Sequence, residues 1–160
     1  MMKLFSQFAA LMEDVKQPWY VAMRPEESAK NDIARIVKQS KIPNPHDKTQ
    51  YHCTLIYSRQ PCKEPQPDRK LKISVQPEKW EVFETRDGKR CLVLKLDSSM
   101  LQVRHKQLMK QLSASYDFPS YKPHITVSYD IGDLDITDIP LPKGPFNMVG
   151  EYSELLDDLD

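Results

Sequence analysis

Two short segments of the sequence nearly repeat each other, and they set the strongest constraint on the fold. They are Tyr51-His52-Cys53-Thr54-Leu55-Ile56-Tyr57 and Pro123-His124-Ile125-Thr126-Val127-Ser128-Tyr129. Each carries a His-x-Thr triplet inside a β-branched and aromatic run, which is typical of a strand. Side chains at positions i and i+2 of a strand share one face. We therefore expect His52 and Thr54 to point to one side and Cys53 to the other. His124 and Thr126 should repeat this arrangement.

Two such strands facing one another would place two imidazoles and two hydroxyls around one small space. One histidine could then take a proton and the other give one, while the threonines hold the non-bridging oxygens of a phosphodiester. A single His-x-Thr triplet would be weak evidence, because short motifs often arise by chance. Two copies in matched apolar context are much stronger. We interpret the catalytic set as His52, Thr54, His124 and Thr126.

The sequence offers little for a metal site or a thiol nucleophile. It has no His-Glu-x-x-His or Cys-x-x-Cys spacing, and two histidines are fewer ligands than a zinc site requires. We therefore expect no metal and no other cofactor. Cys53 should face away from His52, which favours a core position over a catalytic one.

The composition predicts a soluble globular chain. Its 160 residues include 23 basic and 23 acidic side chains, so the formal net charge at pH 7 is zero. No global positive field would collect long DNA or RNA, although a local basic site could hold a small anion. The three cysteines have no metal or redox spacing, and their odd number fits a reducing cytoplasm. No apolar stretch is long enough to span a membrane.

The remaining sequence predicts an alternation of helices and strands. Apolar spacing predicts helices at residues 3–14, from Pro25-Glu26-Glu27 to before Ile42, and at residues 99–115. Beside the two His-x-Thr segments, we expect strands at Trp19–Met23, Leu71–Val75, Trp80–Thr85, Cys91–Leu96 and Phe146–Tyr152. Residues 59–72 are basic and Pro-rich and should form a loop beside the site, while Asp87-Gly88 predicts a hairpin turn. The acidic tail from Glu151 to Asp160 is expected to fray.

The order of these elements indicates two related halves. It runs strand, helix, strand and then hairpin, helix, strand, with one His-x-Thr strand in each half. We interpret residues 1–160 as a single domain of two pseudo-symmetric lobes, at approximately residues 15–75 and 76–155. The expected fold is α+β and bilobal, with two antiparallel sheets facing a central cleft and the helices outside.

The paired His-x-Thr strands resemble the two-histidine (2H) phosphoesterases. That family has a bilobal fold of this kind, needs no metal, and includes RNA 2′,3′-cyclic phosphodiesterases. Over most of the chain the sequence also resembles phage anti-CBASS nucleases, which degrade the cyclic oligonucleotide messengers of bacterial antiviral signalling. The segments that carry this second resemblance are Trp19-Tyr20-Val21-Ala22-Met23-Arg24-Pro25, Ile42-Pro43-Asn44, His52-Cys53-Thr54-Leu55-Ile56-Tyr57-Ser58-Arg59 and Tyr121-Lys122-Pro123-His124-Ile125-Thr126-Val127-Ser128-Tyr129.

The resemblance implies roles for several residues around a substrate. By position, the four residues of the two triplets match the family's catalytic quartet. The anti-CBASS nucleases further imply an aromatic residue near the first strand, a mid-chain aromatic residue and a late glutamate around the nucleobase. The best matches are Tyr20, Trp80 and Glu151. Lys122 would be a phosphate-facing cation beside the second triplet. Each of these residues could instead have a packing or surface role.

These features predict a metal-independent phosphodiesterase that cleaves 3′–5′ linkages of cyclic di- or oligonucleotides and so counters CBASS signalling. The ribose 2′-OH would attack the neighbouring phosphorus, one imidazole taking its proton while the other protonates the departing 5′-oxygen. Which histidine is the base stays open.

Two alternatives also stay open, an RNA 2′,3′-cyclic phosphodiesterase and a protein that sequesters a cyclic nucleotide without cleaving it. The expected partner is a small cyclic nucleotide, with no long nucleic acid and no membrane. The expected location is the cytoplasm, that of the bacterial host if the protein is phage-encoded.

Overall fold

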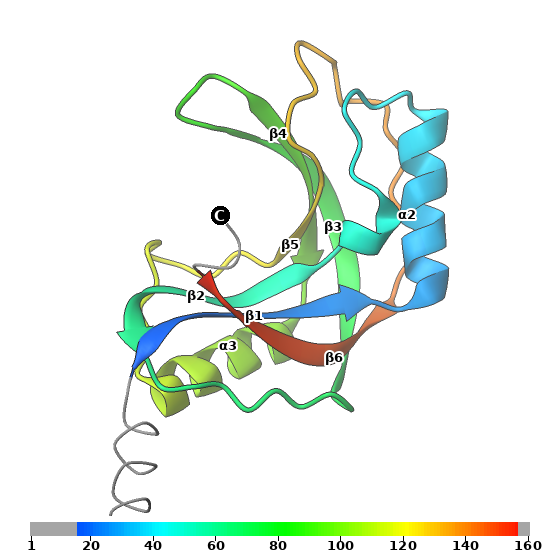
Figure 1. Ribbon diagram of the computed structural model, residues 1–160. Coiled ribbons are helices and arrows are strands. Elements are labelled where there is room, and N and C mark those ends of the chain that lie inside the picture. The colour runs from blue at the N-terminus through cyan, green and yellow to red at the C-terminus, as the bar shows by residue number, and fades with distance from the viewer. Residues whose placement is uncertain (1–15, 157–160) are drawn as a thin grey trace, which may run out of the picture.

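The computed structural model describes residues 16–156, in which six antiparallel strands and two α-helices form the fold (Figure 1). The elements are β1 (Gln17–Pro25), α2 (Glu27–Gln39), the 3₁₀ turn η1 (Lys48–Gln50), β2 (Cys53–Cys62), β3 (Lys72–Glu84), β4 (Arg90–Asp97), α3 (Ser99–Leu112), β5 (His124–Ser128) and β6 (Phe146–Leu155). The helix expected at residues 3–14 lies outside the described residues. Within residues 16–156, no helix has both the length and the apolar character needed to cross a membrane.

The six strands form one closed ring in the order β1, β2, β5, β4, β3, β6. Strands β2, β1 and β6 pair with one another as one half, and β5, β4 and β3 as the other. The halves join at two seams, where β2 meets β5 and where the start of β3 meets β6. The predicted α+β fold is confirmed. The two expected sheets are, however, continuous at their edges, and the last strand lies with the first half of the chain because β6 returns to β1.

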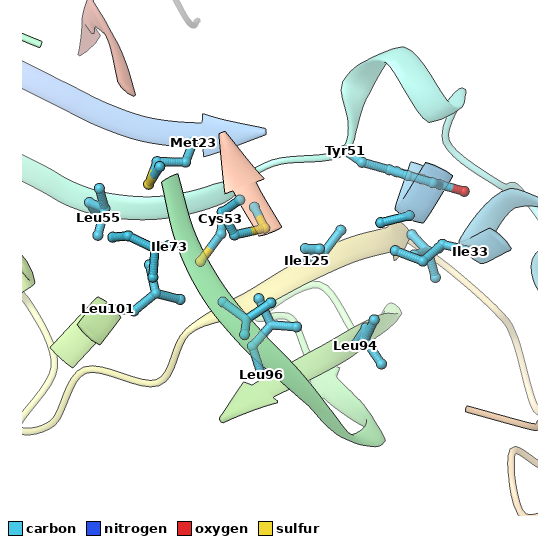
Figure 2. Close-up of a cluster of buried hydrophobic side chains, with 14 of the residues drawn as sticks. Met23, Ile33, Tyr51, Cys53, Leu55, Ile73, Leu94, Leu96, Leu101 and Ile125 are labelled. Carbon is cyan, nitrogen blue, oxygen red and sulfur yellow. The ribbon is translucent and has the colours of Figure 1, made fainter. Parts of the chain in front are cut away.

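The two helices cover the outside of the ring because each has one apolar face (Figure 1). The buried side chains of α2 are Ala29, Ile33, Ile36 and Val37, and those of α3 are Leu101, His105, Leu108 and Leu112. The side chain of Ser98 caps α3 by accepting the backbone N–H of Leu101 at 3.2 Å. Both helices pack on one large hydrophobic core with the strands, and Figure 2 shows Cys53 and Ile125 among its side chains. Cys53 is fully buried, as its place in the strand alternation predicts.

The opposite face of the strands, which we call the site face, carries a different set of side chains. Successive residues of a strand point to opposite faces, so the neighbours of the core residues point here. The site face includes Tyr20, Thr54, Glu81, Phe83, His124 and Thr126.

Register shifts interrupt this alternation at five places along the strands, and three of them bear on the site. Leu55 is an extra residue of β2 relative to β1, so Leu55 and Ile56 both face the core, and Tyr57 returns to the site face. Glu78 is extra in β3 relative to β4, and the chain passes through it as one continuous strand where two were predicted. Gly150 is extra in β6 relative to β1 and has a φ of +68°, a backbone conformation that glycine adopts easily.

Two predictions about irregular segments are wrong. Strand β2 extends to Cys62, and residues 63–71 then pass beneath α3 rather than beside the site (Figure 1). There the backbone N–H of Lys63 donates to the carbonyl of Leu112 at 3.0 Å. The start of the acidic tail does not fray, because residues 151–155 complete β6 and pair with β1. Residues 157–160 lie outside the described residues.

Candidate active site

The two His-x-Thr triplets meet at the seam between β2 and β5. Cys53 pairs with Ile125 in antiparallel register. Directly opposite residues of antiparallel strands share a face, so this register sets one histidine opposite the threonine of the other triplet on each side. The four predicted catalytic side chains are all half-buried on the site face. They therefore lie next to one another on two paired strands rather than facing each other from two separate sheets.

Both imidazoles are oriented by the same local hydrogen bond. Nδ1 of His52 lies 2.8 Å from the carbonyl oxygen of Gln50, and Nδ1 of His124 lies 2.8 Å from the carbonyl oxygen of Lys122. A carbonyl only accepts, so Nδ1 carries the proton in each ring. This leaves both Nε2 atoms for chemistry, as a proton acceptor in the neutral ring and a donor in the protonated ring.

The surroundings of His124 act on its charge in opposite directions. Burial lowers the pKa of His124 below its ordinary value, and the Lys122 carbonyl partly opposes this effect. The nearby charge of His52 lowers the pKa further, while the carboxylate of Glu81 raises it. Glu81 lies two strands from Thr126 along one row of the sheet. Its Oε2 is buried and has no hydrogen-bond partner among the described residues.

Thr54 is held from two sides. Its hydroxyl donates to the hydroxyl oxygen of Tyr20 at 3.2 Å, and its carbonyl accepts from the hydroxyl of Tyr121 at 2.7 Å. The Tyr121 ring stacks on His105, with centroids 4.2 Å apart and an interplanar angle of 7°. His105 Nδ1 lies 2.7 Å from the carbonyl of Leu55. Because β2 and β5 share only one residue pair, these carbonyls need donors from elsewhere, and Tyr121 and His105 supply them.

Two cavities flank His124. The first has a volume of about 480 Å³ and is mainly aromatic; it is lined by Phe83, Glu84, Tyr116, Phe118, Pro119, Ser120, Lys122 and His124. Here the Phe83 ring meets the His124 ring edge to face, with centroids 5.3 Å apart. The second, of about 590 Å³, reaches both Thr54 and His124 and has three cationic side chains in its lining. A further cavity, of about 870 Å³, lies against α2 and contains none of the four predicted catalytic residues.

Tyr20 and Lys122, two of the four predicted substrate contacts, lie at the site. Tyr20 is 5% exposed, and its ring meets the edge of His52 with centroids 5.9 Å apart. The Tyr20 ring has no free face on which a base could stack. Its hydrogen bond with the Thr54 hydroxyl is therefore a better supported role than contact with a base. Lys122 is exposed and lines both cavities beside His124.

The prediction that Trp80 contacts a nucleobase is wrong, because Trp80 belongs to the core. Its side chain is 8% exposed, and its indole N–H donates to the carbonyl of Pro140 at 2.9 Å. Phe83 is the aromatic residue of β3 that reaches the site. Phe83 was not identified in the sequence analysis. The available signal was strand alternation, because Trp80 and Val82 face the core while Glu81 and Phe83 face the other side.

The same correction applies to Glu151. Its carboxylate accepts from Nε and Nη2 of Arg104 at 2.6 and 2.7 Å, and from the backbone N–H of Asp68 at 2.9 Å. The bulge at Gly150 sets the register that turns Glu151 towards α3. The late carboxylate on the site face is Glu154, which lies opposite Tyr20 across the β1–β6 pair.

Within residues 16–156, no group of three or more His, Cys, Asp or Glu side chains is arranged to hold a metal ion. The donor set at the seam is two imidazoles and two hydroxyls. Metal independence itself stays a prediction.

Comparisons with known proteins agree on family and fold. A family model described as anti-CBASS protein Acb1 matches residues 17–160. The anti-CBASS protein Acb1 of Vibrio phage KVP40 is 32% identical over 141 residues, covering 88% of this chain and 89% of the phage protein. The anti-CBASS protein Acb1 of Enterobacteria phage T4 is 32% identical over 131 residues, covering 81% and 84%.

Solved structures show the same fold at lower sequence identity. Escherichia coli LigT in complex with 3′-AMP has a TM-score of 0.58 at 16% identity, covering 87% of each chain. A second structure, described as a phosphoesterase, has a TM-score of 0.56 at 15% identity, again covering 87% of each chain. The ring of strands is thus the fold of the 2H phosphoesterases.

Proposed function

Because this chain belongs to the Acb1 family of anti-CBASS proteins, we propose that it cleaves the 3′–5′ linkages of cyclic di- or oligonucleotides. Such cleavage would remove the messengers of bacterial antiviral signalling in the cytoplasm of the host. The observation that carries the proposal is the pair of imidazoles, each with Nδ1 bonded to a carbonyl and Nε2 left for proton transfer. Binding alone does not require two titratable groups placed in duplicate.

The reaction uses the two histidines in opposite protonation states. The neutral imidazole takes the proton of the ribose 2′-OH, which attacks the neighbouring phosphorus. The protonated imidazole delivers a proton from Nε2 to the departing 5′-oxygen, which leaves a 2′,3′-cyclic phosphate. Thr54 and Thr126 donate hydrogen bonds to the non-bridging oxygens as charge develops, and Lys122 adds a positive charge beside them. The Thr54 hydroxyl has one proton, so when that proton turns to the phosphate the Tyr20 hydroxyl, 3.2 Å away, can donate to the Thr54 oxygen and hold it in place.

The aromatic cavity beside His124 suits a nucleobase. Phe83 forms one wall next to the reacting groups, and Tyr116 and Phe118 line the same space. Stacking of a base on an aromatic side chain contributes about 1–3 kcal/mol and tolerates every base. A base in this cavity should therefore add to the affinity of the substrate, with little discrimination between the four bases.

The test is a product analysis of three substrates in the presence of EDTA. Purified protein is incubated with 3′3′-cGAMP, a cyclic trinucleotide and an RNA that ends in a 2′,3′-cyclic phosphate, and the products are separated by chromatography. Opening of the rings supports the proposal. Turnover of the RNA end alone would instead indicate an RNA 2′,3′-cyclic phosphodiesterase, and tight binding without turnover would indicate sequestration. Loss of activity in EDTA, restored by a divalent ion, would contradict a metal-free mechanism.

Variants of the two histidines complete the test. His52→Ala and His124→Ala should each lower the rate by about 10²- to 10⁴-fold, because each removes one proton transfer. Lys110→Ala, at an exposed position of α3, is the control. Circular dichroism confirms that each variant is folded. A near-wild-type rate in either histidine variant would rule out the two-histidine mechanism.

A further inference from the structure

We propose that the second cavity beside His124 holds the phosphate of the cyclic substrate that is not being cleaved, with Arg59 and Arg86 around it and Lys122 between it and the reacting phosphate. The inference rests on the proposed function and names what binds beyond the reacting phosphate. A cyclic dinucleotide has two phosphates, and the four residues of the His-x-Thr triplets account for only one of them.

Three cations from separate parts of the chain line this cavity. Arg59 belongs to β2, Arg86 to the turn between β3 and β4, and Lys122 to the segment before β5. The cavity has one carboxylate, Asp117, which lies 2.7 Å from Nε of Arg59. Neither Arg86 nor Lys122 forms an ion pair with another residue in the described part of the chain. Two positive charges are therefore left uncompensated in a chain whose net charge is zero.

The two cavities differ in the chemistry they offer, although both open onto His124. The first is mainly aromatic, and its only cation is Lys122, with Glu84 in the same lining. The second adds two guanidinium groups. A guanidinium matches a phosphate with paired hydrogen bonds, and an ammonium group binds it as a point charge. This difference assigns the base to the first cavity and the distal phosphate to the second.

Exposed aromatic side chains border the cationic cavity as well. Tyr57 is 41% exposed and Phe118 is 67% exposed, and both line it. Large exposed aromatic groups interleaved with cations are typical of surfaces that bind single-stranded nucleotides. Figure 1 shows the β3–β4 hairpin, whose turn carries Arg86, projecting from the ring of strands. The second nucleotide of a cyclic dinucleotide can thus lie between this hairpin and β2.

The experiment compares a substrate with two phosphates and one with a single phosphate. The enzyme is assayed with 3′3′-cGAMP and with the linear dinucleoside monophosphate ApG, which has one 3′–5′ bond and no second phosphate. We compare the kcat/KM for 3′3′-cGAMP with the kcat/KM for ApG. Arg86→Gln should lower the ratio of the first value to the second by about 3- to 10-fold, because it removes one exposed phosphate contact. Lys89→Gln removes the same charge from the same hairpin but from outside the cavity, and it should keep the wild-type ratio.

The outcomes separate this inference from the proposed function. An unchanged ratio in Arg86→Gln, or the same fall in Lys89→Gln, would overturn the distal phosphate site while the enzyme remains active. If the wild-type protein cleaves neither compound, the proposed function fails. The distal phosphate site is then tested by binding affinities measured by calorimetry. In that case Arg86→Gln should weaken binding of the 2′-deoxy ring more than binding of the matching linear dinucleotide. Equal weakening of both would again overturn the site.

Discussion

Arg104→Met should destabilise the fold strongly, because it leaves the buried carboxylate of Glu151 without its charged partner. Glu151 is 2% exposed and accepts three hydrogen bonds, two from Arg104 and one from the backbone of Asp68. Removing Arg104 leaves that charge with a single donor. Breaking a buried pair in this way costs about 3–5 kcal/mol. In a chain of this length each kcal/mol lowers Tm by about 2–4 °C, so the expected loss is about 6–20 °C.

The assay is thermal and urea unfolding followed by circular dichroism. The matched control is Arg35→Met, which breaks a carboxylate pair with Asp32 on the surface of α2, where Arg35 is 53% exposed. Its cost should stay below about 1 kcal/mol. A double variant, Arg104→Met with Glu151→Leu, should recover part of the lost stability, because it removes both charges from the buried site.

Two results would refute this reasoning. One is an Arg104→Met variant whose Tm falls no further than that of Arg35→Met. The other is a Glu151→Leu variant that, at a temperature where it is fully folded, loses affinity for 3′3′-cGAMP while keeping the Tm of the wild-type protein. The second result would indicate that Glu151 contacts the substrate, as expected from the sequence analysis.

Four further predictions concern the site. Tyr121→Phe removes the donor to the Thr54 carbonyl, at a cost of about 1–3 kcal/mol in a buried position; kcat should fall with the circular dichroism spectrum unchanged, and an unaltered kcat would contradict the positioning role. Glu81→Gln removes a charge that raises the pKa of His124. That pKa should fall further, so whichever limb of the pH–rate profile His124 controls should move to lower pH: the acidic limb if it is the base, the alkaline limb if it is the acid. A limb that moves to higher pH would be inconsistent with the geometry. Phe83→Ala should raise KM for 3′3′-cGAMP by more than it lowers kcat, and the reverse pattern would exclude a stacking role. A cyclic dinucleotide built on deoxyribose should bind but resist cleavage, and its rapid turnover would rule out attack by a 2′-OH.

The shared face of the two polar side chains in each His-x-Thr triplet could be predicted from the sequence, because it depends on local geometry. A His-x-Thr triplet on any strand places its two polar side chains on one face. Both triplets also bring their own orienting carbonyl, two residues upstream, so the tautomer repeats with the motif. The helices and most strands could be predicted for the same reason, since apolar periodicity is a local signal.

The surrounding contacts depend on features that a local pattern does not contain. Bulges at Glu78 and Gly150 decide the register of β3 and β6, and with it the direction of Trp80, Phe83 and Glu151. A shift of one residue moves a side chain to the other face of the sheet. The closure of the ring is equally non-local, because β6 has to return to β1 across the whole length of the chain.

The pairing of β1 with β6 brings the first and last strands of the described chain together, with Trp19 opposite Leu155. The ring of strands therefore has no preferred starting point in space. A circular permutant that links the two ends and opens the chain in the connection at residues 132–138 would keep every strand pair, including the β2–β5 seam. The architecture is in this sense independent of the order in which the polypeptide is synthesised, and the paired triplets would meet at the same place.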